Sequence, residues 1–488
     1  MKKYEAQVVV VAGGPSGLAA AVQAAESGAS VIVLEKAAAV GGAANMGMGP
    51  LGIGTRFQRQ QMSEITVEKA FNMFMEYTHY NVDARLIKRY FSLSADTISW
   101  LEDKGVEFEG AFRYFPKAEP TWHIVKCDTG IGPRAASFMN KALYARALEL
   151  GVQFFLETPG QKLLKDESGK ICGVIARDKS GEEIQIDCQA AILATGGAGA
   201  NAKLIKEETG FTHGEDLFSF AIPGLVGDGI RMAWEVGVDR LPVRVELTSE
   251  VENGGAITGS VANVFTQPNL LVNRFGVRVM NEEQMQNTTY LGNVVRHQKD
   301  KICFSIVDSS IVHSYITHGV DVTSLVRTNP DVSDFYSGLD QAKEQGFDTF
   351  YVADTIEELA EKAGIRPEAL RKTVDAYNEY CEIGDEEFFK DKRFMRPLVK
   401  GPYFAASLRP AGYGTVGGIR INENCECCDK DFEPIPGLYA VGADACNIYD
   451  DSYMFLLPGN SMGFAVNTGR IAGMEAAAYI ARGTGKES

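Results

Sequence analysis

The first part of the chain alternates short runs of β-branched residues with a stretch rich in small residues. Residues 8–11 are four consecutive valines, and residues 31–34 form a second run that is apolar at every position. Such runs are typical of parallel strands that are buried on both faces. Residues 18–25 are rich in alanine and predict a helix that ends at Gly28. The pattern therefore predicts a strand–helix–strand unit over residues 8–36.

Similar elements return much later in the chain. Residues 190–193 form another buried run, and residues 463–481 predict a helix rich in small residues. Between them, residues 355–381 have apolar positions at spacings of three and four, which predicts amphipathic helices. An N-terminal unit whose partner segments return near the C-terminus predicts an α/β fold that is interrupted by an inserted middle part.

A glycine turn follows the first predicted strand. Gly14 lets the backbone approach a pyrophosphate, and Gly17 lets helix and strand pack closely. Pro15 and Ser16 lie between them, so that the N-terminus of the helix faces the phosphates. Glu35 ends the second strand, where a carboxylate can accept hydrogen bonds from a ribose. These positions predict a dinucleotide site, and the alternative is an ordinary strand–helix–strand unit without a nucleotide.

One position departs from the G-x-G-x-x-G pattern of such turns. Ala12 stands where the pattern has its first glycine. We expect the methyl group to have a modest steric cost, and Gly13 to take part of the strain of the turn.

Further glycine clusters favour FAD over NAD. Residues 40–54 form a glycine-dense loop, including Gly41 and Gly49, whose backbone amides can pack on a flat ring system. A third cluster follows the run at residues 190–193 and contains Thr195 and Gly196. A fourth covers residues 436–444, including Gly442, and continues at residues 458–463.

Composition and charge narrow the function classes. The chain has 488 residues, 45% apolar and 23% charged, which is typical of a globular protein of two to four domains or of one large fold with an insertion. Its net charge of −16 disfavours nucleic acid and anionic membranes as partners. No apolar window approaches the ~18 residues of a membrane span, and the apolar run at the start is too short for a signal peptide. An odd number of scattered cysteines, nine in all, indicates a reduced cytoplasmic location.

Together these segments resemble the flavoprotein family of soluble fumarate reductases and succinate dehydrogenase flavoprotein subunits, which also includes 3-ketosteroid dehydrogenases. The resemblance is carried by the residue 12–17 turn with Glu35, the residue 41–54 loop, the residue 194–197 and 227–229 turns, and residues 271–282, 417–419, 436–444 and 459–461. It implies a Rossmann-like FAD-binding domain over residues 1–237 and 411–488, with an inserted α+β capping domain over residues 238–410.

The resemblance also assigns residues to the parts of a non-covalent FAD. Ser16, Glu35 and Lys36 would hold the adenosine and phosphate end, and Asp444 would meet the ribityl chain. The residues expected around the isoalloxazine ring are Gly42, Ala43, Gly47 and Met48, with Asp228 nearby, and Asn460, Ser461 and Met462 at the flavin N1/C2=O edge. The residue 40–54 loop contains no histidine for a covalent flavin link.

The substrate site departs from the fumarate-reducing members of this family, which bind carboxylates with Arg and His. By resemblance, Gln286 occupies the position of the proton-donating Arg, and Phe265, Leu456 and Tyr413 stand near other charged positions. Two unpaired carboxylates in such a pocket would cost several kcal/mol each, so fumarate is disfavoured as the substrate.

Four residues are candidates for catalysis, of which Gln286 is the first. Tyr413 stands four residues before Gly417. This arrangement resembles that of ketosteroid dehydrogenases, in which a Tyr hydroxyl and a backbone amide polarise a carbonyl group. The alternative is that Tyr413 packs against the flavin. Arg409 is either an ion-pair residue of the hinge or a substrate ligand, and Tyr453 lies in the loop before Asn460, near the expected pocket wall. Cys425, Cys427 and Cys428 are too closely spaced for a zinc or iron–sulfur site, and no metal is expected.

These observations favour an FAD-dependent ene-reductase that transfers a hydride from flavin N5 to an activated C=C bond of an apolar, aromatic or alicyclic small molecule. No Cys-x-x-Cys-His haem motif is present, so electrons are expected from a separate redox protein or a diffusible reductant. The alternatives are a dehydrogenase that introduces C=C beside a ketone, and a flavin electron-transfer subunit without an organic substrate.

Overall fold

The computed structural model describes residues 2–219, 221–251, 259–325, 331–449 and 452–483. Contacts between residues divide the chain into two compact units. The first unit combines residues 1–210, 220–246 and 414–488, and the second combines residues 211–219 and 247–413. The domain boundaries expected from the sequence, 237/238 and 410/411, stay a prediction.

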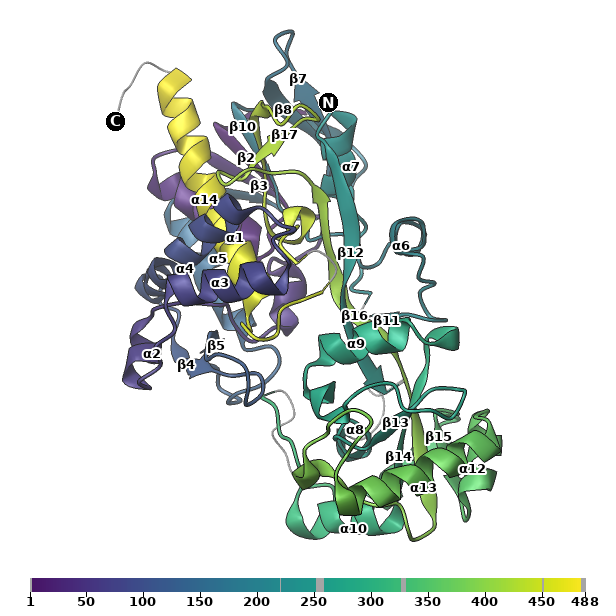
Figure 1. Ribbon diagram of the computed structural model, residues 1–488. Coiled ribbons are helices and arrows are strands. Elements are labelled where there is room, and N and C mark those ends of the chain that lie inside the picture. Colours follow the sequence, from purple (N-terminus) through teal and green to yellow (C-terminus); the bar gives the residue numbers. More distant parts are fainter. Residues whose placement is uncertain (1, 220, 252–258, 326–330, 450–451, 484–488) are drawn as a thin grey trace. The chain divides into compact units, whose positions relative to one another are not determined.

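The first unit is built on a six-stranded sheet whose central strands are the apolar runs of the sequence (Figure 1). Strands β2 (Val8–Val11), β3 (Val31–Leu34) and β10 (Ala190–Leu193) are buried at every residue, as predicted. Strand β2 pairs in parallel with both of the others. The order is β17–β18–β10–β2–β3–β6, with β6 at Gln153–Phe155, β17 at Glu426–Cys428 and β18 at Pro434–Ala440. The sheet confirms the predicted α/β class.

Two helices rich in small residues pack against each other in this unit. Helix α1 (Pro15–Glu26) connects β2 to β3, and the yellow helix α14 (Asn460–Gly483) lies beside it in Figure 1. A Cβ on Gly469 would lie 2.3 Å from the carbonyl oxygen of Ser16, and one on Gly473 would lie 2.7 Å from that of Ala20. Because these contacts leave no room for side chains, the two glycines set the close approach of the helices. Both predicted helices are confirmed.

The first unit contains a second sheet, of four strands, and several helices. Its order is β1–β9–β8–β7, with β1 at Lys2–Glu5, β7 at Gly160–Lys165, β8 at Ile171–Arg177 and β9 at Glu183–Asp187. Strands β4 (Phe108–Phe112) and β5 (Trp122–Val125) form an antiparallel pair. The helices are α2 (Arg56–Gln60), α3 (Val67–Tyr77), α4 (Ala84–Asp103), α5 (Ala136–Glu149), α6 (Ala202–Thr209) and α7 (Asp228–Glu235).

A mixed sheet is built around the long strand β16 (Tyr403–Ile419), of which residues 403–413 belong to the second unit, as do residues 247–251 of β12. Its path is β11–β16–β14–β13, and β12 and β15 also pair with β16. The strands are β11 (Phe218–Ser219), β12 (Arg240–Val251), β13 (Leu270–Val272), β14 (Cys303–Asp308) and β15 (Phe350–Ala353). The helices are α8 (Gly259–Phe265), α9 (Thr288–Arg296), α10 (Ser309–His318), α11 (Phe335–Glu344), α12 (Ile356–Ala363) and α13 (Pro367–Ile383). Helices α12 and α13 confirm the amphipathic helices predicted over residues 355–381.

A buried ionic network ties two segments of the second unit together. The guanidinium of Arg278 lies 2.8 Å from Glu282 and 2.7 Å from Asp385, and all three side chains are fully buried. The amine of Lys390 lies 3.5 Å from the carboxylate of Glu282. Because each buried charge has an opposite partner, removing one member would leave another uncompensated.

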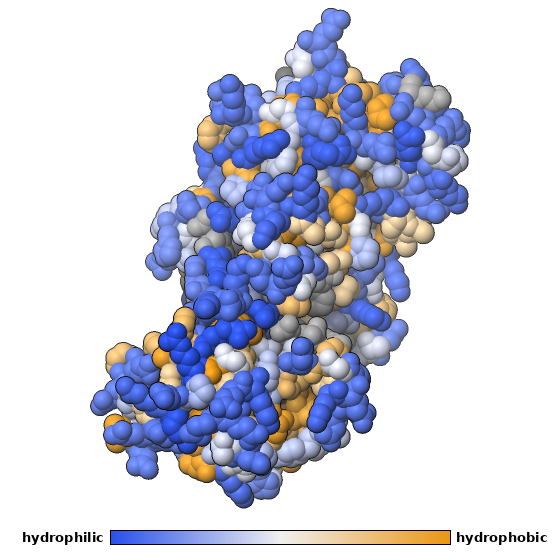
Figure 2. All heavy atoms as spheres, turned by 90° about the vertical axis from the view of Figure 1, so that its right-hand side faces the viewer, coloured by the Kyte–Doolittle hydropathy of each residue, from blue (hydrophilic) through white to orange (hydrophobic). Residues whose placement is uncertain are grey.

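None of the helices in the described part of the chain combines the length and the apolar character that a membrane crossing requires. Figure 2 shows that hydrophilic residues cover most of the visible face, with hydrophobic residues in small groups between them.

Candidate functional site

The turn between β2 and α1 has an unusual conformation at Ala12. Its φ is 87°, in the left-handed region that favours glycine, whereas Gly13 has no positive φ. The expectation that Gly13 takes part of the strain is therefore wrong, because the alanine itself adopts the strained conformation. A Cβ on Gly17 would lie 2.0 Å from the carbonyl oxygen of Ala12, so Gly17 permits the contact between turn and helix that was predicted.

Glu35 binds the turn from the end of β3. One carboxylate oxygen accepts the backbone N–H of Gly13 at 2.7 Å, and the other accepts that of Ala37 at 2.7 Å. The side chain is buried. A carboxylate has about four acceptor positions, so it can also bind a ribose hydroxyl.

Lys36 and Asp228 form an ion pair of 2.7 Å in the same region. The pair places Asp228, the first residue of α7, beside the strand end that carries Glu35. Asp228 therefore lies with the residues expected around the adenosine, whereas the sequence suggested a position near the ring.

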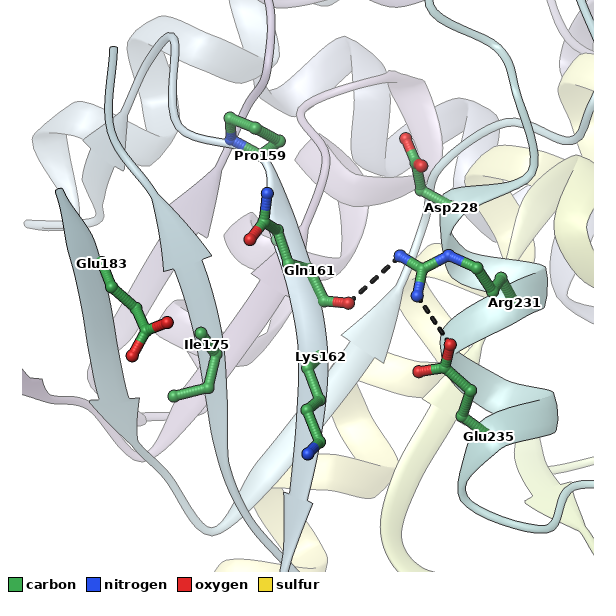
Figure 3. A pocket seen from close by; sticks show the side chains of 9 residues that line it. Pro159, Gln161, Lys162, Ile175, Glu183, Asp228, Arg231 and Glu235 are labelled. Carbon is green, nitrogen blue, oxygen red and sulfur yellow. Dashed lines mark hydrogen bonds and ion pairs between the residues drawn. The ribbon is translucent and has the colours of Figure 1, made fainter. Parts of the chain in front are cut away.

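An open depression of about 600 Å³ adjoins this ion pair (Figure 3). Arg231 donates to the carbonyl oxygen of Gln161 at 3.1 Å and to the carboxylate of Glu235 at 2.8 Å, and Asp228 points toward the same space. The backbone N–H of Thr158, the residue before Pro159, donates to the carbonyl oxygen of Glu35 at 2.8 Å, so the depression lies next to the end of β3.

The glycine-dense loop contacts the turn between β2 and α1. The backbone N–H of Gly41 donates to the carbonyl oxygen of Gly13 at 2.8 Å, and a Cβ on Gly42 would lie 3.7 Å from the Cα of Gly14. Gly42 begins a short 3-10 helix that contains Ala43. The structure thus brings together two glycine clusters that α1 and β3 separate along the sequence.

The end of this loop reaches the first turn of α14. A Cβ on Gly47 would lie 2.5 Å from the methyl carbon of Met462, and the backbone N–H of Leu51 donates to the carbonyl oxygen of Gly459 at 2.8 Å. The carbonyl oxygen of Met48 accepts the N–H of Val125 at 2.9 Å, and a Cβ on Gly49 would collide with the backbone of His123. The residues expected around the ring therefore lie together.

Asp444 joins the third and fourth glycine clusters. Its buried carboxylate accepts the backbone N–H groups of Thr195 at 2.5 Å and Gly197 at 2.8 Å, on either side of Gly196, and also the hydroxyl of Thr195. Burial raises the pKa of Asp444, and these hydrogen bonds oppose the shift. A Cβ on Gly442 would lie 2.9 Å from the hydroxyl of Ser16, so this cluster contacts α1.

The N-terminus of α14 carries a buried amide. The Oδ1 of Asn460 accepts the hydroxyl of Tyr90 at 3.0 Å. Its Nδ2 has no hydrogen-bond partner within the part of the chain that the structure describes, although the residue is fully buried. An unpaired buried donor is costly, which indicates that a ligand accepts from it.

These residues fit the FAD that the resemblance implies. The unpaired Nδ2 of Asn460 supplies a donor at the expected ring edge. A Cβ on Gly14 would meet nothing within 4 Å, so the turn faces open space, and Gly42 is exposed. With FAD bound, Glu35 and the turn would hold the adenosine diphosphate, while the residue 41–49 loop and the start of α14 would line the ring.

The four catalytic candidates fall in different units. Tyr453 belongs to the first unit, where its hydroxyl oxygen accepts the backbone N–H of Ser461 at 3.3 Å. Tyr413, Arg409 and Gln286 belong to the second unit. There Arg409 donates to the carbonyl oxygen of Asp300 at 2.9 Å, and Gln286 donates to that of Glu283 at 3.2 Å.

Glu246, a polar residue of the first unit, was not singled out from the sequence. The hydroxyl of Ser461 donates to the carboxylate of Glu246 at 2.6 Å. Burial raises the pKa of Glu246 to about 7. The sequence signal was a glutamate between Val245 and Leu247 in a segment that also contains Arg240, Arg244 and Glu250, which does not distinguish a functional residue from an exposed one.

The closely spaced cysteines are buried. Cys427 and Cys428 lie in β17, which pairs with β18, and Cys425 precedes it. Burial raises the pKa values of all three thiols, so they are neutral packing residues.

Comparisons with known proteins agree with this site. The profile of the family described as "FAD binding domain" matches residues 7–462. A vinyl phenol reductase of Lactiplantibacillus plantarum is 31% identical over 484 residues, covering 97% of this chain and 96% of that protein. A fumarate reductase (cytochrome) of Shewanella frigidimarina is 28% identical over 482 residues, covering 97% of this chain and 77% of that protein. The structure of a 3-ketosteroid-Δ4-(5α)-dehydrogenase from Rhodococcus jostii, with bound 4-androstene-3,17-dione, has a TM-score of 0.79 at 25% identity and 98% coverage of both chains.

Proposed function

Because the chain belongs to the FAD binding domain family and is an FAD-dependent oxidoreductase that acts on CH–CH groups, we propose that it reduces the activated C=C bond of an apolar, aromatic or alicyclic substrate. The similarity to a vinyl phenol reductase over almost the full length of both chains supports an aromatic alkene as the substrate.

A continuous group of aromatic rings carries the proposal. Tyr114 stacks on Phe455 with ring centroids 4.7 Å apart, Phe455 lies 4.6 Å from Tyr453, and Tyr453 lies 4.8 Å from Tyr449. We call these four residues the aromatic wall. Through Tyr453 the wall reaches Ser461, at the expected flavin edge. All four side chains are buried, so the wall is a packed, uncharged layer beside Ser461. Such a layer suits an aromatic substrate better than a dicarboxylate, whose charges it could not hydrate.

The chemistry divides between cofactor and protein. Bound FAD, once reduced, supplies a hydride to the alkene. The N-terminus of α14 stabilises negative charge at its end of the ring through the helix dipole. The buried Asn460 amide orients the ring edge, and the aromatic wall holds the substrate and excludes water.

We also propose an external electron donor, either a redox protein or a diffusible reductant. The sequence contains no Cys-x-x-Cys-His motif, and among the described residues the His, Cys, Asp and Glu side chains form no group of three or more that could hold a metal ion. A cytoplasmic location is part of the proposal, supported by nine cysteines that are all free thiols.

Reoxidation of the reduced holoenzyme tests this function. The bound flavin is bleached with dithionite under anaerobic conditions, and 4-vinylphenol, a cyclic enone or fumarate is then added. We expect 4-vinylphenol to restore the oxidised flavin spectrum faster than fumarate does. Faster reoxidation by fumarate would contradict the proposal, and reoxidation by a redox protein alone would support the electron-transfer alternative.

A second candidate is a dehydrogenase that introduces C=C beside a ketone. It is favoured by the similarity to the ketosteroid dehydrogenase structure and by Tyr413, which precedes Gly417. Anaerobic addition of a saturated cyclic ketone to the oxidised holoenzyme would then bleach the flavin.

A further inference from the structure

Three polar groups from separate segments of the first unit meet at the start of α14. The Oε1 of Glu246, at the end of this unit's part of β12, accepts the hydroxyl of Ser461 at 2.6 Å. The backbone N–H of Ser461 donates to the hydroxyl oxygen of Tyr453 at 3.3 Å. The carboxyl group is therefore fixed beside the helix terminus that is expected to face the flavin edge.

The groups that face this carboxyl from the segment before α14 are neutral. Cys446, Tyr449 and Tyr453 face it from the segment before α14, and burial raises the pKa of each well above its ordinary value, so none carries a charge at pH 7. Arg244 lies two residues earlier on β12. Burial raises the pKa of Glu246 to about 7, while the hydrogen bond from Ser461 acts in the opposite direction. Near neutral pH the group can therefore both give and accept a proton.

We propose that Glu246 is the catalytic acid of the reaction, an inference that rests on the proposed alkene reduction. A neutral carboxyl group supplies the proton that the family resemblance assigns to an Arg, at whose position this chain has Gln286. Ser461 engages Oε1, so Oε2 carries the transferable proton. Ser461 binds Glu246 through its hydroxyl and Tyr453 through its backbone N–H, so the carboxyl is linked to the aromatic wall through one residue.

The proposed step balances. With reduced FAD bound, the β-carbon of the alkene would receive a hydride. The π electrons would form a bond between the α-carbon and the Glu246 proton, and the O–H bond of Glu246 would break. The product gains two hydrogens, and Glu246 remains as a carboxylate that accepts the Ser461 hydroxyl and regains its proton from water. A separate two-electron donor then reduces the oxidised cofactor again.

Variants of the holoenzyme test the inference. Glu246→Gln keeps the size of the side chain but removes the proton, Glu246→Asp keeps the acid on a shorter side chain, and Glu149→Gln is a control at an exposed residue of α5. The rate of reoxidation by 4-vinylphenol after dithionite reduction is measured from pH 5 to 9, after flavin content and circular dichroism have been matched. Infrared spectra of the oxidised holoenzyme, without substrate, follow the carbonyl stretch of protonated carboxyl groups over the same range.

We expect Glu246→Gln to slow reoxidation by about 10²–10⁴-fold and Glu246→Asp to retain part of the rate, with the control unchanged. The wild-type rate should fall above pH 7, and this step should be absent from Glu246→Gln. A carboxyl band that titrates near pH 7 should be present in the wild type and the control and missing from Glu246→Gln.

Two results would overturn the inference. If the wild type reduces 4-vinylphenol and Glu246→Gln keeps its rate and pH profile, Glu246 is not the acid and the proposed function stands. If the wild type reduces no alkene, the proposed function and this inference fail together. The absence of the titrating infrared band from the wild type would also contradict the inference.

Discussion

Glu35 and Gly13 are joined by a 2.7 Å hydrogen bond from the glycine backbone N–H to the carboxylate. This bond connects the end of β3 to the turn after β2, so one side chain both shapes the turn and faces the expected adenosine site. Loss of the carboxylate would therefore release the turn and also remove an acceptor at the expected adenosine site.

Glu35→Ala is expected to weaken FAD binding by roughly 10- to 100-fold, since a hydrogen bond to a charged group contributes about 1.5–3 kcal/mol. The dissociation constant is measured by titrating apoprotein with FAD and following flavin fluorescence. Glu35→Gln keeps one acceptor oxygen and should give an intermediate value. If Glu35→Ala binds FAD with wild-type affinity, Glu35 only shapes the turn and does not contribute to cofactor binding.

Ala12→Gly is expected to raise the free energy of unfolding by about 1 kcal/mol, because glycine adopts a φ of 87° without the penalty that a Cβ carries. Chemical denaturation of the holoenzyme measures the change. Ala25→Gly, in helix α1, is the control and should lower stability by roughly 0.5–1 kcal/mol. If both variants lose stability, the strain at Ala12 is not relieved by glycine.

Tyr413→Phe distinguishes the two candidate reactions. A tyrosine hydroxyl that polarises a ketone should matter for enones, so their turnover is expected to fall by about 10²–10⁴-fold. The turnover of 4-vinylphenol, which has no carbonyl group, should change far less. Both rates are followed by anaerobic reoxidation of the reduced flavin, and equal, small effects would show that Tyr413 only packs.

His123 should make the stability of the protein dependent on pH. Its ring is fully buried, lies 2.8 Å from the hydroxyl of Thr55 and 3.0 Å from the carbonyl oxygen of Thr121, and has a pKa lowered to about 4 by burial. The unfolded chain takes up a proton near pH 6.5 and the folded chain does not, so this contribution is present above pH 6.5 and is lost as the pH falls toward 4.

The expected loss at this histidine is roughly 1 kcal/mol between pH 7.5 and 5.5. Urea unfolding at the two pH values gives this change in the free energy of unfolding for the wild type and for His123→Gln. The variant is the control, because the other titrating groups contribute equally in both proteins. The wild type should lose more stability than the variant, and equal losses would contradict the assignment.

The sequence predicted the elements of the nucleotide unit because their signals are local. The valines of β2 and the small residues of α1 need only strand and helix patterns to be recognised, and the profile match over residues 7–462 confirms the family. The pairing of Lys36 with Asp228 could not be derived in this way, because it depends on where the fold places the start of α7, 192 residues later in the chain.

The same limit applies to Glu246 and Ala12. The residue type does not reveal the surroundings of Glu246, and burial in the folded chain is what raises its pKa. The strain at Ala12 follows from the backbone path of the turn, whereas the sequence pattern suggested that the neighbouring glycine would absorb it.

Strand β10 lies between β2 and β18, which joins residues from both ends of the chain in one sheet. A ribosome that adds ~5–20 residues per second needs tens of seconds to pass from β10 to β18, with the whole of the 247–413 segment made in between. Until β18 and α14 emerge, one edge of β10 has no partner and α1 lacks the helix against which it packs most extensively. Nascent chains stopped before residue 434 should therefore fail to retain FAD, and this interval is when the unfinished sheet is most exposed to aggregation and to chaperones.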